Sequence, residues 1–193
     1  MSNTKNMLIE VARKLFAENG KKNVTMNDIA EASKKGRRTL YTYFNNKEEI
    51  YKAVIDKELD SILEKLTVVS AQKTEPDIKL TNHILTHLDA LKDVVNRNGS
   101  LRADFFHDIY EVERKRRKID IKEIALIRSI ISEGIEKNIF KRMDTELSSI
   151  IIFYAIKGLE VPYIRQNISI EFAKNKNSIV EFVFMGIKRN NPK

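Results

Sequence analysis

Apolar residues recur along most of the chain at intervals of three and four positions, the spacing of helices that bury one face. The first such segment, residues 3–19, ends at Asn19 and Gly20, a pair typical of a helix C-terminus. Its apolar positions are Leu8, Val11, Ala12, Leu15 and Phe16. Similar stripes follow within residues 47–69, 76–97, 100–110, 119–139, 144–162 and 178–187. With two shorter segments, 25–33 and 37–44, the pattern predicts an all-α protein of about nine helices.

Residues 25–44 contain two short helices separated by a tight turn. Thr25 is a good N-cap for the first helix, and Asp28 places a negative charge where the helix dipole favours it. The turn consists of Lys34, Lys35 and Gly36. In the second helix Leu40 and Phe44 face inward, four residues apart. Its outward positions are Arg37, Arg38, Tyr41 and Thr42. Two such helices, the second presenting arginines and hydroxyls, are typical of a helix-turn-helix DNA-binding unit.

The positive charge of the chain is concentrated in its first quarter. The whole sequence has a net charge of +8, and residues 1–47 contribute +6 through ten basic and four acidic residues. The remainder holds 25 basic against 23 acidic residues. A basic region that coincides with the helix-turn-helix is the charge pattern of a protein that binds the phosphate backbone of DNA.

Two sequence runs resemble the N-terminal domain of the TetR (tetracycline-repressor) family of bacterial transcriptional regulators. They are DIAEAS at residues 28–33 and TLYTYFNNKEEIYKAV at residues 39–54. The I-A pair, the T-L-Y-x-Y-F run and the K-E-E-I entry to the next helix stand at the family's spacing, and the similarity covers Met7 to Val54. The resemblance implies a dimer that binds a palindromic operator and carries a C-terminal helical domain for ligand binding and dimerisation. The alternative is a helical hairpin with no role in DNA binding.

The sequence departs from the family pattern at three places in this domain. The turn is Lys34-Lys35-Gly36 where the family usually has Gly-Val-Ser. Arg38 stands where a glycine is frequent, and Met26 stands where a second threonine is frequent. Arg38 adds a long hydrogen-bond donor, and Met26 removes one phosphate-binding hydroxyl. We expect these changes to alter the preferred operator sequence rather than DNA binding itself.

We expect the recognition helix to read bases with Arg37 and Arg38, because both lie in its first turn and arginine can bond O6 and N7 of guanine. The competing interpretation is that both arginines bind only phosphate. Thr39 is short enough to touch a thymine methyl, and Asn27 is a further base or phosphate contact. Lys47 is unfavourable for the dipole of its helix, so we expect it to bind phosphate, with a solvated lysine as the alternative. The DNA-binding candidates are Thr25, Asn27, Lys34, Lys35, Arg37, Arg38, Thr39, Tyr41, Thr42, Tyr43 and Lys47.

Candidate ligand-binding residues are polar side chains mixed with aromatic ones in the fifth and sixth predicted helices. They are His83, His87, Arg102, Phe105, Phe106 and Tyr110. The two histidines stand four residues apart, which suits a metal ion, but no third ligand is within sequence reach and we predict no metal site. The residues of the sixth helix could equally lie on the surface or in a contact between domains.

The last two predicted helices are so apolar that they need a partner surface. In the TetR family the corresponding helices form a four-helix bundle across a two-fold axis, and a two-fold DNA site favours a two-fold protein. The expected interface residues are Phe153, Ile156, Tyr163, Ile179, Phe182 and Val183. The alternative is one large internal core.

Three local signals set helix boundaries in the second half of the chain. Residues 113–118, ERKRRK, indicate the basic end of a helix, with a second DNA-binding patch as the alternative. Pro162 should kink or end the eighth helix. Ser178 and Glu181 have the spacing of a capping box for the last helix.

Composition excludes several classes of protein. The chain has no cysteine, no signal-peptide core at its start, and no apolar run approaching the ~18–20 residues needed to span a bilayer. We therefore expect a cytoplasmic protein with no membrane partner. No nucleophile elbow, phosphate loop or paired-carboxylate signature is present, so we predict neither an enzyme nor a cofactor.

The sequence thus predicts a three-helix DNA-binding domain at residues 1–47 and a ligand-binding and dimerisation domain at residues 48–193, connected by the helix at about 47–69. The predicted function is a transcriptional regulator, a repressor released from a palindromic DNA operator by an unknown small-molecule effector. The alternative is a helical DNA-binding or interaction protein without such an effector.

Overall fold

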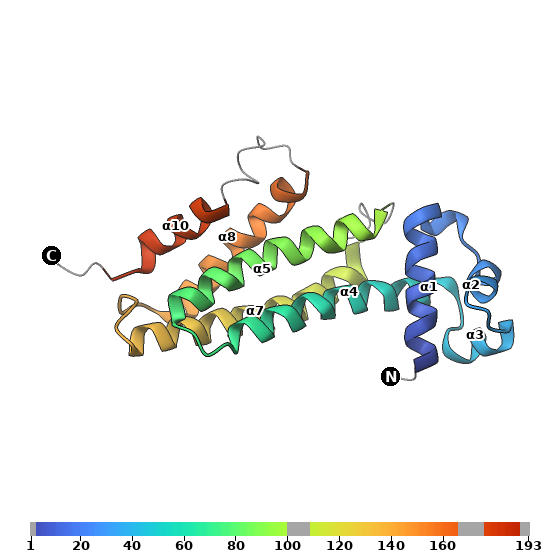
Figure 1. The fold of residues 1–193 in the computed structure, drawn as a ribbon, viewed down its shortest axis with the longest axis horizontal. Coiled ribbons are helices and arrows are strands. Elements are labelled where there is room, and N and C mark those ends of the chain that lie inside the picture. Colours follow the sequence, from blue (N-terminus) through green and yellow to red (C-terminus); the bar gives the residue numbers. More distant parts are fainter. Residues whose placement is uncertain (1–2, 100–108, 166–175, 190–193) are drawn as a thin grey trace. The chain divides into compact units, whose positions relative to one another are not determined.

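The structure is a computed structural model that describes residues 3–99, 109–165 and 176–189, and within these ranges the fold is all-α, as predicted. Figure 1 labels the helices. Their bounds are α1 Asn3–Asn19, α2 Met26–Ala32, α3 Arg37–Tyr43, α4 Lys47–Ser70, α5 Pro76–Arg97, α7 Ile109–Glu136, α8 Thr145–Arg165 and α10 Lys176–Ile187, with a 3₁₀ turn, η1, at Lys21–Asn23. In the described ranges the only extended pairing is one antiparallel bridge between Phe140 and Lys188. No described helix combines the length and the apolar character needed to cross a bilayer.

Short polar side chains fix where several helices begin. Thr25 Oγ1 accepts a hydrogen bond from Asp28 N at 3.2 Å, and Thr25 N donates to Asp28 Oδ2 at 2.8 Å, which closes a capping box at the start of α2. These bonds lower the pKa of the Asp28 carboxyl. At the start of α4, Asn46 Oδ1 accepts from Glu49 N at 2.9 Å. The Glu49 carboxylate reaches Asn45 N rather than Asn46 N, so this cap involves two consecutive asparagines.

The chain forms two compact units. The first contains Met1–Ser61 and Asp93–Arg117, and the second contains Ile62–Lys92 and Lys118–Lys193. In the first unit α1 buries one face against the helices that follow it in sequence. The buried residues of this core include Leu8, Ile9, Ala12, Phe16, Ile29, Ala30, Leu40, Phe44, Ile50 and Val54.

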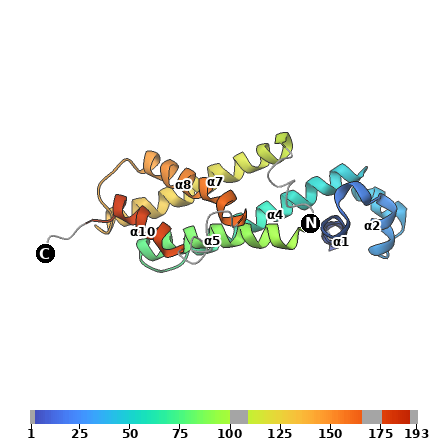
Figure 2. The same ribbon diagram turned by 90° about the horizontal axis from the view of Figure 1, so that it is seen from above.

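In the second unit, parts of α5 and α7 pack with α8 and α10 around one apolar core (Figure 2). Its buried members are Leu80, Ile84, Leu88, Ile127, Ile130, Ile131, Phe140, Ile152, Phe153, Ile156, Val180 and Ile187. Gly134 is required in this core because a Cβ there would lie 2.0 Å from Phe140 Cδ2. The ring of Phe140 therefore packs directly on the backbone of α7.

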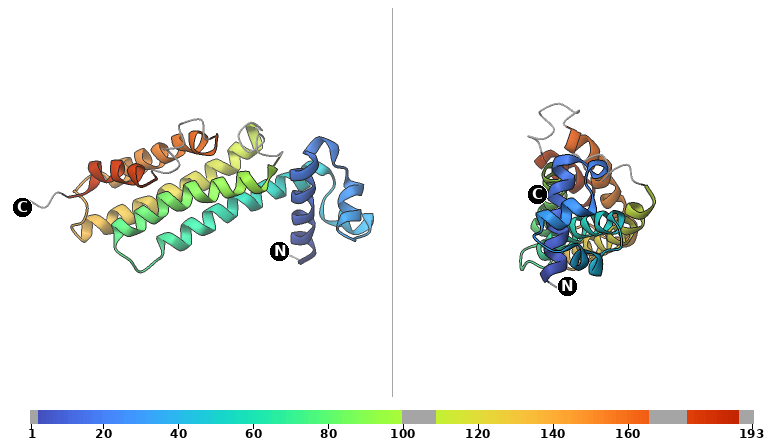
Figure 3. Two further views of the ribbon diagram at one scale, coloured as in Figure 1. Left: turned by 45° about the horizontal axis from the view of Figure 1, so that its top comes forward. Right: turned by 90° about the vertical axis from the view of Figure 1, so that its right-hand side faces the viewer.

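Two predicted helix boundaries in the second half of the chain were wrong, those at residues 113–118 and at Ser178. The helix α7 runs without interruption through residues 113–118, so ERKRRK is not a helix end (Figure 3). No glycine or proline lies there to stop the helix. Pro162 was predicted to kink or end α8, and it does not end it, because the helix continues to Arg165. Because α10 begins at Lys176, Ser178 lies inside the helix rather than capping it.

Candidate nucleic-acid interface

The turn between α2 and α3 is held by backbone hydrogen bonds. Lys34 N donates to Glu31 O at 2.9 Å, and Lys35 N donates to Ala30 O at 3.1 Å. Lys34 adopts a left-handed conformation with φ of 53°. Gly36 precedes α3 with an ordinary φ of −60°, so the glycine is not the residue that reverses the chain. The turn therefore places two exposed lysines directly before the arginines of α3.

The helix α3 presents opposite faces to the core and to solvent. Leu40 and Phe44, which follows the helix, are buried at 0% and 4% exposure. The outward side chains Arg37, Arg38, Tyr41 and Thr42 are all exposed. The hydroxyl of Thr42 donates to Arg38 O at 2.9 Å, so its hydrogen is used within the helix. The surface that α3 offers to nucleic acid is thus mainly the two arginines and Tyr41.

Arg37 and Arg38 differ in how they are held. Arg37 Nε donates to Asn27 Oδ1 at 2.8 Å, a bond that joins α3 to α2 across the turn. The two terminal nitrogens of Arg37 have no partner in the described ranges, and neither does the guanidinium of Arg38. Asn27 was predicted as a base or phosphate contact, and in the structure it orients an arginine. Its ten-residue separation from Arg37 gave no sequence signal for this role.

Lys47 is half-buried rather than fully solvated. Its ammonium donates to Lys21 O at 2.8 Å and to Lys22 O at 3.4 Å, which ties the first turn of α4 to η1. An ammonium has three donors, so one N–H remains for a phosphate oxygen. The neighbouring Lys21 pairs with Glu48 at 2.7 Å. Lys47 therefore has a structural role that is compatible with the predicted phosphate contact.

The remaining DNA-binding candidates lie on the same part of the first unit. Thr25, Asn27, Lys34 and Lys35 are exposed, whereas Thr39 and Tyr43 are half-buried. All eleven candidates belong to the stretch from the N-cap of α2 to the first turn of α4. Of the candidates on α3, the basic side chains are exposed and Thr39 is half-buried.

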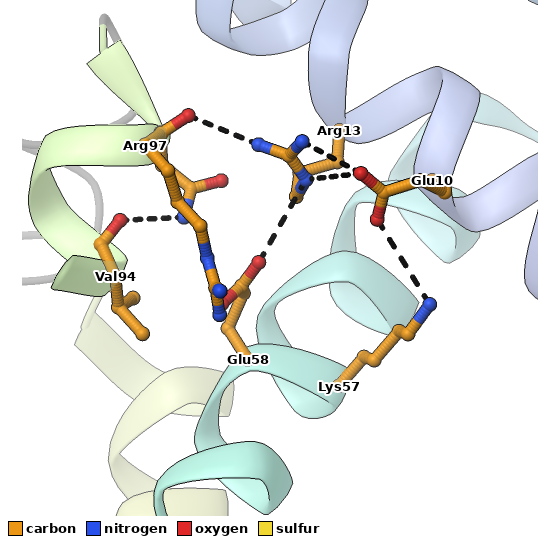
Figure 4. A network of polar contacts seen from close by, with 7 residues as sticks. Glu10, Arg13, Lys57, Glu58, Val94 and Arg97 are labelled. Atoms are coloured by element: carbon orange, nitrogen blue, oxygen red, sulfur yellow. Dashed lines mark hydrogen bonds and ion pairs between the residues drawn. The ribbon is translucent and has the colours of Figure 1, made fainter. Parts of the chain in front are cut away.

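A network of charged side chains in the first unit joins α1 to α4 and to the end of α5 (Figure 4). Arg13 bonds Glu10 at 2.6 Å and donates to Arg97 O at 3.0 Å. Arg97 Nε donates at 3.0 Å to the carboxylate of Glu58, a residue that is 5% exposed. The hydrogen bond from Arg13 lowers the pKa of Glu10. Beside this network Gly99 approaches α1 so closely that a Cβ would lie 2.6 Å from Ala17 O.

This network holds the first helix of the DNA-binding unit in place, and sequence reasoning missed it. The pair Glu10 and Arg13 has helical i, i+3 spacing and could have been found. Glu58 and Arg97 are 39 residues apart and carry no local signal.

Of the predicted ligand-binding residues, His83 and His87 are buried in the second unit. His83 Nε2 lies 3.2 Å from Glu123 Oε1, and His87 Nδ1 lies 2.7 Å from the same oxygen. His87 Nε2 lies 3.1 Å from Glu160 Oε1. No group of three acidic or histidine side chains suited to a metal ion occurs in the described ranges. Tyr110 belongs to α7, and Arg102, Phe105 and Phe106 lie outside the described residues.

Opposing effects set the protonation of this cluster. Burial alone would lower the pKa of His87, but the charge of Glu123 and hydrogen bonds to Glu123 and Glu160 raise it to about 10. Burial alone would raise the pKa of Glu123, but the charge of His87 and hydrogen bonds from both histidines lower it to about 2. At neutral pH the cluster is therefore a buried ion pair that joins α5 and α7, with α8 bonded through Glu160.

The predicted dimer residues divide into two groups. Phe153 and Ile156 lie in the core of the second unit, at 1% and 0% exposure, so neither faces outward in the single chain. They were predicted at the interface because α8 is apolar on nearly every side. Ile179 and Val183 are half-buried, Phe182 is 77% exposed, and Tyr163 belongs to α8. The exposed apolar side chains of α8 and α10 are Leu147, Ile151, Tyr154, Phe182 and Met185.

Residues 8–54 match the family model of bacterial regulatory proteins of the tetR family. The uncharacterized HTH-type transcriptional regulator YhgD of Bacillus subtilis is 23% identical, over 96% of this chain and 97% of its own length. The fatty acid metabolism regulator protein of Bacillus subtilis is also 23% identical, over 93% of each chain. These relatives are regulators and not enzymes.

Solved structures of transcriptional regulators share the whole fold. A regulator from Cytophaga hutchinsonii superposes with a TM-score of 0.79 at 22% identity, over 95% of this chain and 98% of that one. The regulator FadR of Bacillus subtilis, solved in complex with stearoyl-CoA, has a TM-score of 0.70 at 22% identity. The superposition covers 94% of this chain and 98% of that one.

Proposed function

We infer that the chain is a TetR-family DNA-binding transcriptional regulator. We propose that it is a cytoplasmic repressor that binds a palindromic operator as a dimer until a small molecule releases it. The observation that carries this proposal is the exposed basic surface of the turn and the first turn of α3, where Asn27 of α2 orients Arg37. A helix that presents arginines in its first turn suits the major groove.

Arg37 is the better candidate for reading a base. Its Nε–H is bonded to Asn27, which leaves both terminal nitrogens for the O6 and N7 atoms of one guanine. The same bond restricts the side chain before DNA binds, so less conformational entropy is lost on binding. Arg38 lies about 100° further around α3 and has no such support. We assign Arg38 to the phosphate backbone together with Tyr41, Lys34, Lys35 and Lys47.

These roles can be tested by selecting preferred sequences from randomised duplex DNA. Arg37→Ala should lose the preference for one G·C pair in each half-site, a discrimination of ~1–3 kcal/mol. Asn27→Leu, which has a similar size but no acceptor, should weaken the preference at the same pair. Arg38→Ala and Lys47→Ala should weaken binding to all DNA sequences about equally. Both should also make the affinity for DNA less dependent on salt concentration.

The opposite pattern, with the preferred base changed by Arg38→Ala and unchanged by Arg37→Ala, would reverse the two assignments. Failure of the native protein to bind any selected duplex at low salt would remove DNA binding from the proposal.

Similarity to a fatty acid metabolism regulator and to a regulator bound to stearoyl-CoA supports a long-chain acyl thioester as the first effector class to test. Stearoyl-CoA should release the protein from its selected duplex in a gel-shift titration, and coenzyme A alone should not. If neither this compound nor a panel of other small molecules causes release, the alternative of a DNA-binding protein without an effector is favoured.

A further inference from the structure

A basic pocket lies in the second unit, where the connection from α7 to α8 meets the chain that follows α10. Its volume is about 400 Å³, within the range of small-molecule sites. The pocket is lined by Ile135, Asn138, Phe140, Lys141, Arg142 and Arg189. None of the proposed DNA-binding or dimer residues is among them.

Backbone hydrogen bonds hold the floor of this pocket. Asn138 adopts a left-handed conformation with φ of 59°, and Ile139 N and Phe140 N both donate to Gly134 O. The antiparallel bridge adds two bonds, from Lys141 N to Ile187 O at 2.9 Å and from Arg189 N to Ile139 O at 3.1 Å. The backbone that carries the lining side chains is therefore held from both sides.

The charges of the pocket are unbalanced. Its lining contains three cations and no acidic residue. Among the described residues, Lys141, Arg142 and Arg189 form no ion pair with a carboxylate. Two neighbouring cations outside the lining do have partners, since Lys137 pairs with Glu133 at 3.1 Å and Lys188 pairs with Asp77 at 3.4 Å. The lining therefore carries positive charge that no carboxylate of the described residues pairs with, unlike these two neighbours.

The polar side-chain groups that the pocket offers to a ligand are donors. Arg189 Nη1 donates to Asn138 Oδ1 at 3.0 Å, which fixes the guanidinium and leaves the amide N–H₂ of Asn138 as a further donor. Guanidinium and ammonium groups bind phosphate oxygens with charge-assisted hydrogen bonds. One carboxylate would neutralise a single cation, whereas a diphosphate carries enough charge and enough oxygens for all three.

We propose that the pocket formed by Asn138, Lys141, Arg142 and Arg189 binds the diphosphate group of a small phosphorylated anion. The group can come from free pyrophosphate or from a nucleotide-containing compound, and both present the same oxygens. The proposal does not depend on the operator or on the identity of the effector.

Isothermal titration of the full chain with inorganic pyrophosphate, in dilute buffer of low ionic strength, tests this site. The variant K141Q/R142Q removes two lining charges and breaks no side-chain hydrogen bond or ion pair found among the described residues. It should bind pyrophosphate at least about tenfold more weakly. The matched control K137Q/K188Q removes the same charge nearby and should change the affinity less than about twofold. If K141Q/R142Q does not fold, R189Q provides the second test.

Equal weakening of pyrophosphate binding in both double variants would overturn the site. It would show that pyrophosphate is attracted by the positive charge of this surface as a whole and not by the lining residues. Absence of binding to the native chain at about 1 mM pyrophosphate would overturn it as well. Parallel titrations with ADP and coenzyme A identify the source, since tighter binding than pyrophosphate supports a nucleotide-borne diphosphate and weaker binding supports free pyrophosphate. Loss of DNA binding in K141Q/R142Q, with pyrophosphate binding retained, would instead assign the two cations to DNA.

Discussion

Lys34 is a lysine at a backbone position that favours glycine. Its φ of 53° brings the Cβ close to the backbone carbonyl, at a cost of roughly 1–2 kcal/mol for a non-glycine residue. The TetR pattern usually has glycine at this point of the turn, and the structure shows the physical reason. A lysine kept at a strained and exposed position is consistent with the proposed phosphate contact.

We expect Lys34→Gly to raise the free energy of unfolding by about 1 kcal/mol, or roughly 2–4 °C in melting temperature, while weakening DNA binding. Lys35 does not have a positive φ, so Lys35→Gly is a matched control that should destabilise by a few tenths of a kcal/mol to about 1 kcal/mol. Thermal unfolding by circular dichroism measures both. Destabilisation of equal size in the two variants would contradict strain at Lys34.

Single residues of the DNA-binding face were only partly predictable. Leu40 and Phe44 could be assigned to the core because they share one helical face, and the arginines to solvent because they do not. The bond from Arg37 to Asn27 depends on how the turn places α2 against α3, which residue spacing does not encode. For the same reason the attachment of Lys47 to the carbonyls of η1 was not foreseen.

At the scale of helices, helix interiors that lack proline and glycine were predicted better than the residues at which the helices begin and end. The stripe on α5 was clear from sequence, and so was the four-residue spacing of His83 and His87. Their partners Glu123 and Glu160 come from α7 and α8, between 36 and 73 residues away. Because such partners meet only after the helices pack, the cluster looked like a possible metal site lacking a third ligand.

The charged state of this cluster predicts how stability depends on pH. His87 has its pKa raised from 6.5 to about 10, so its stabilisation is complete below pH 6.5 and is lost as pH rises through about 10. Glu123 has its pKa lowered from 4.5 to about 2, so its stabilisation is present above pH 4.5 and is lost as pH falls through about 2. Stability from the cluster should therefore be greatest between about pH 4.5 and 6.5.

We expect the melting temperature to fall between pH 6.5 and 9, below the range in which exposed lysines titrate. The double variant His87→Gln/Glu123→Gln keeps polar groups at both positions but removes both charges, so its melting temperature should vary less over this range. Differential scanning calorimetry at several pH values makes the comparison. A native melting temperature that stays constant from pH 6.5 to 9 would show that His87 is not held as an imidazolium.

For the whole molecule, the surface of the second unit adds information that the sequence lacked. Leu147, Ile151 and Tyr154 stand at helical spacing on α8, and each is between 56% and 59% exposed. Phe182 and Met185 on α10 are each 77% exposed. The apolar pattern of these helices could not distinguish side chains of the internal core, such as Phe153, from those left outside. We propose that the exposed stripes of α8 and α10 form the dimer interface, since exposed apolar stripes of this kind mark association surfaces.

Phe182→Glu should convert the dimer into a folded monomer, because the charge would be buried unpaired in the interface at a cost of several kcal/mol. Phe182 is largely exposed in the single chain, so the substitution leaves the core of the second unit intact. Ile121→Glu is the matched control, since Ile121 is 62% exposed on α7 and lies outside the two stripes. Sedimentation velocity at micromolar concentration should show a monomer for the first variant and a dimer for the second. A monomer observed for the native chain under the same conditions would contradict both the interface and the two-fold operator that depends on it.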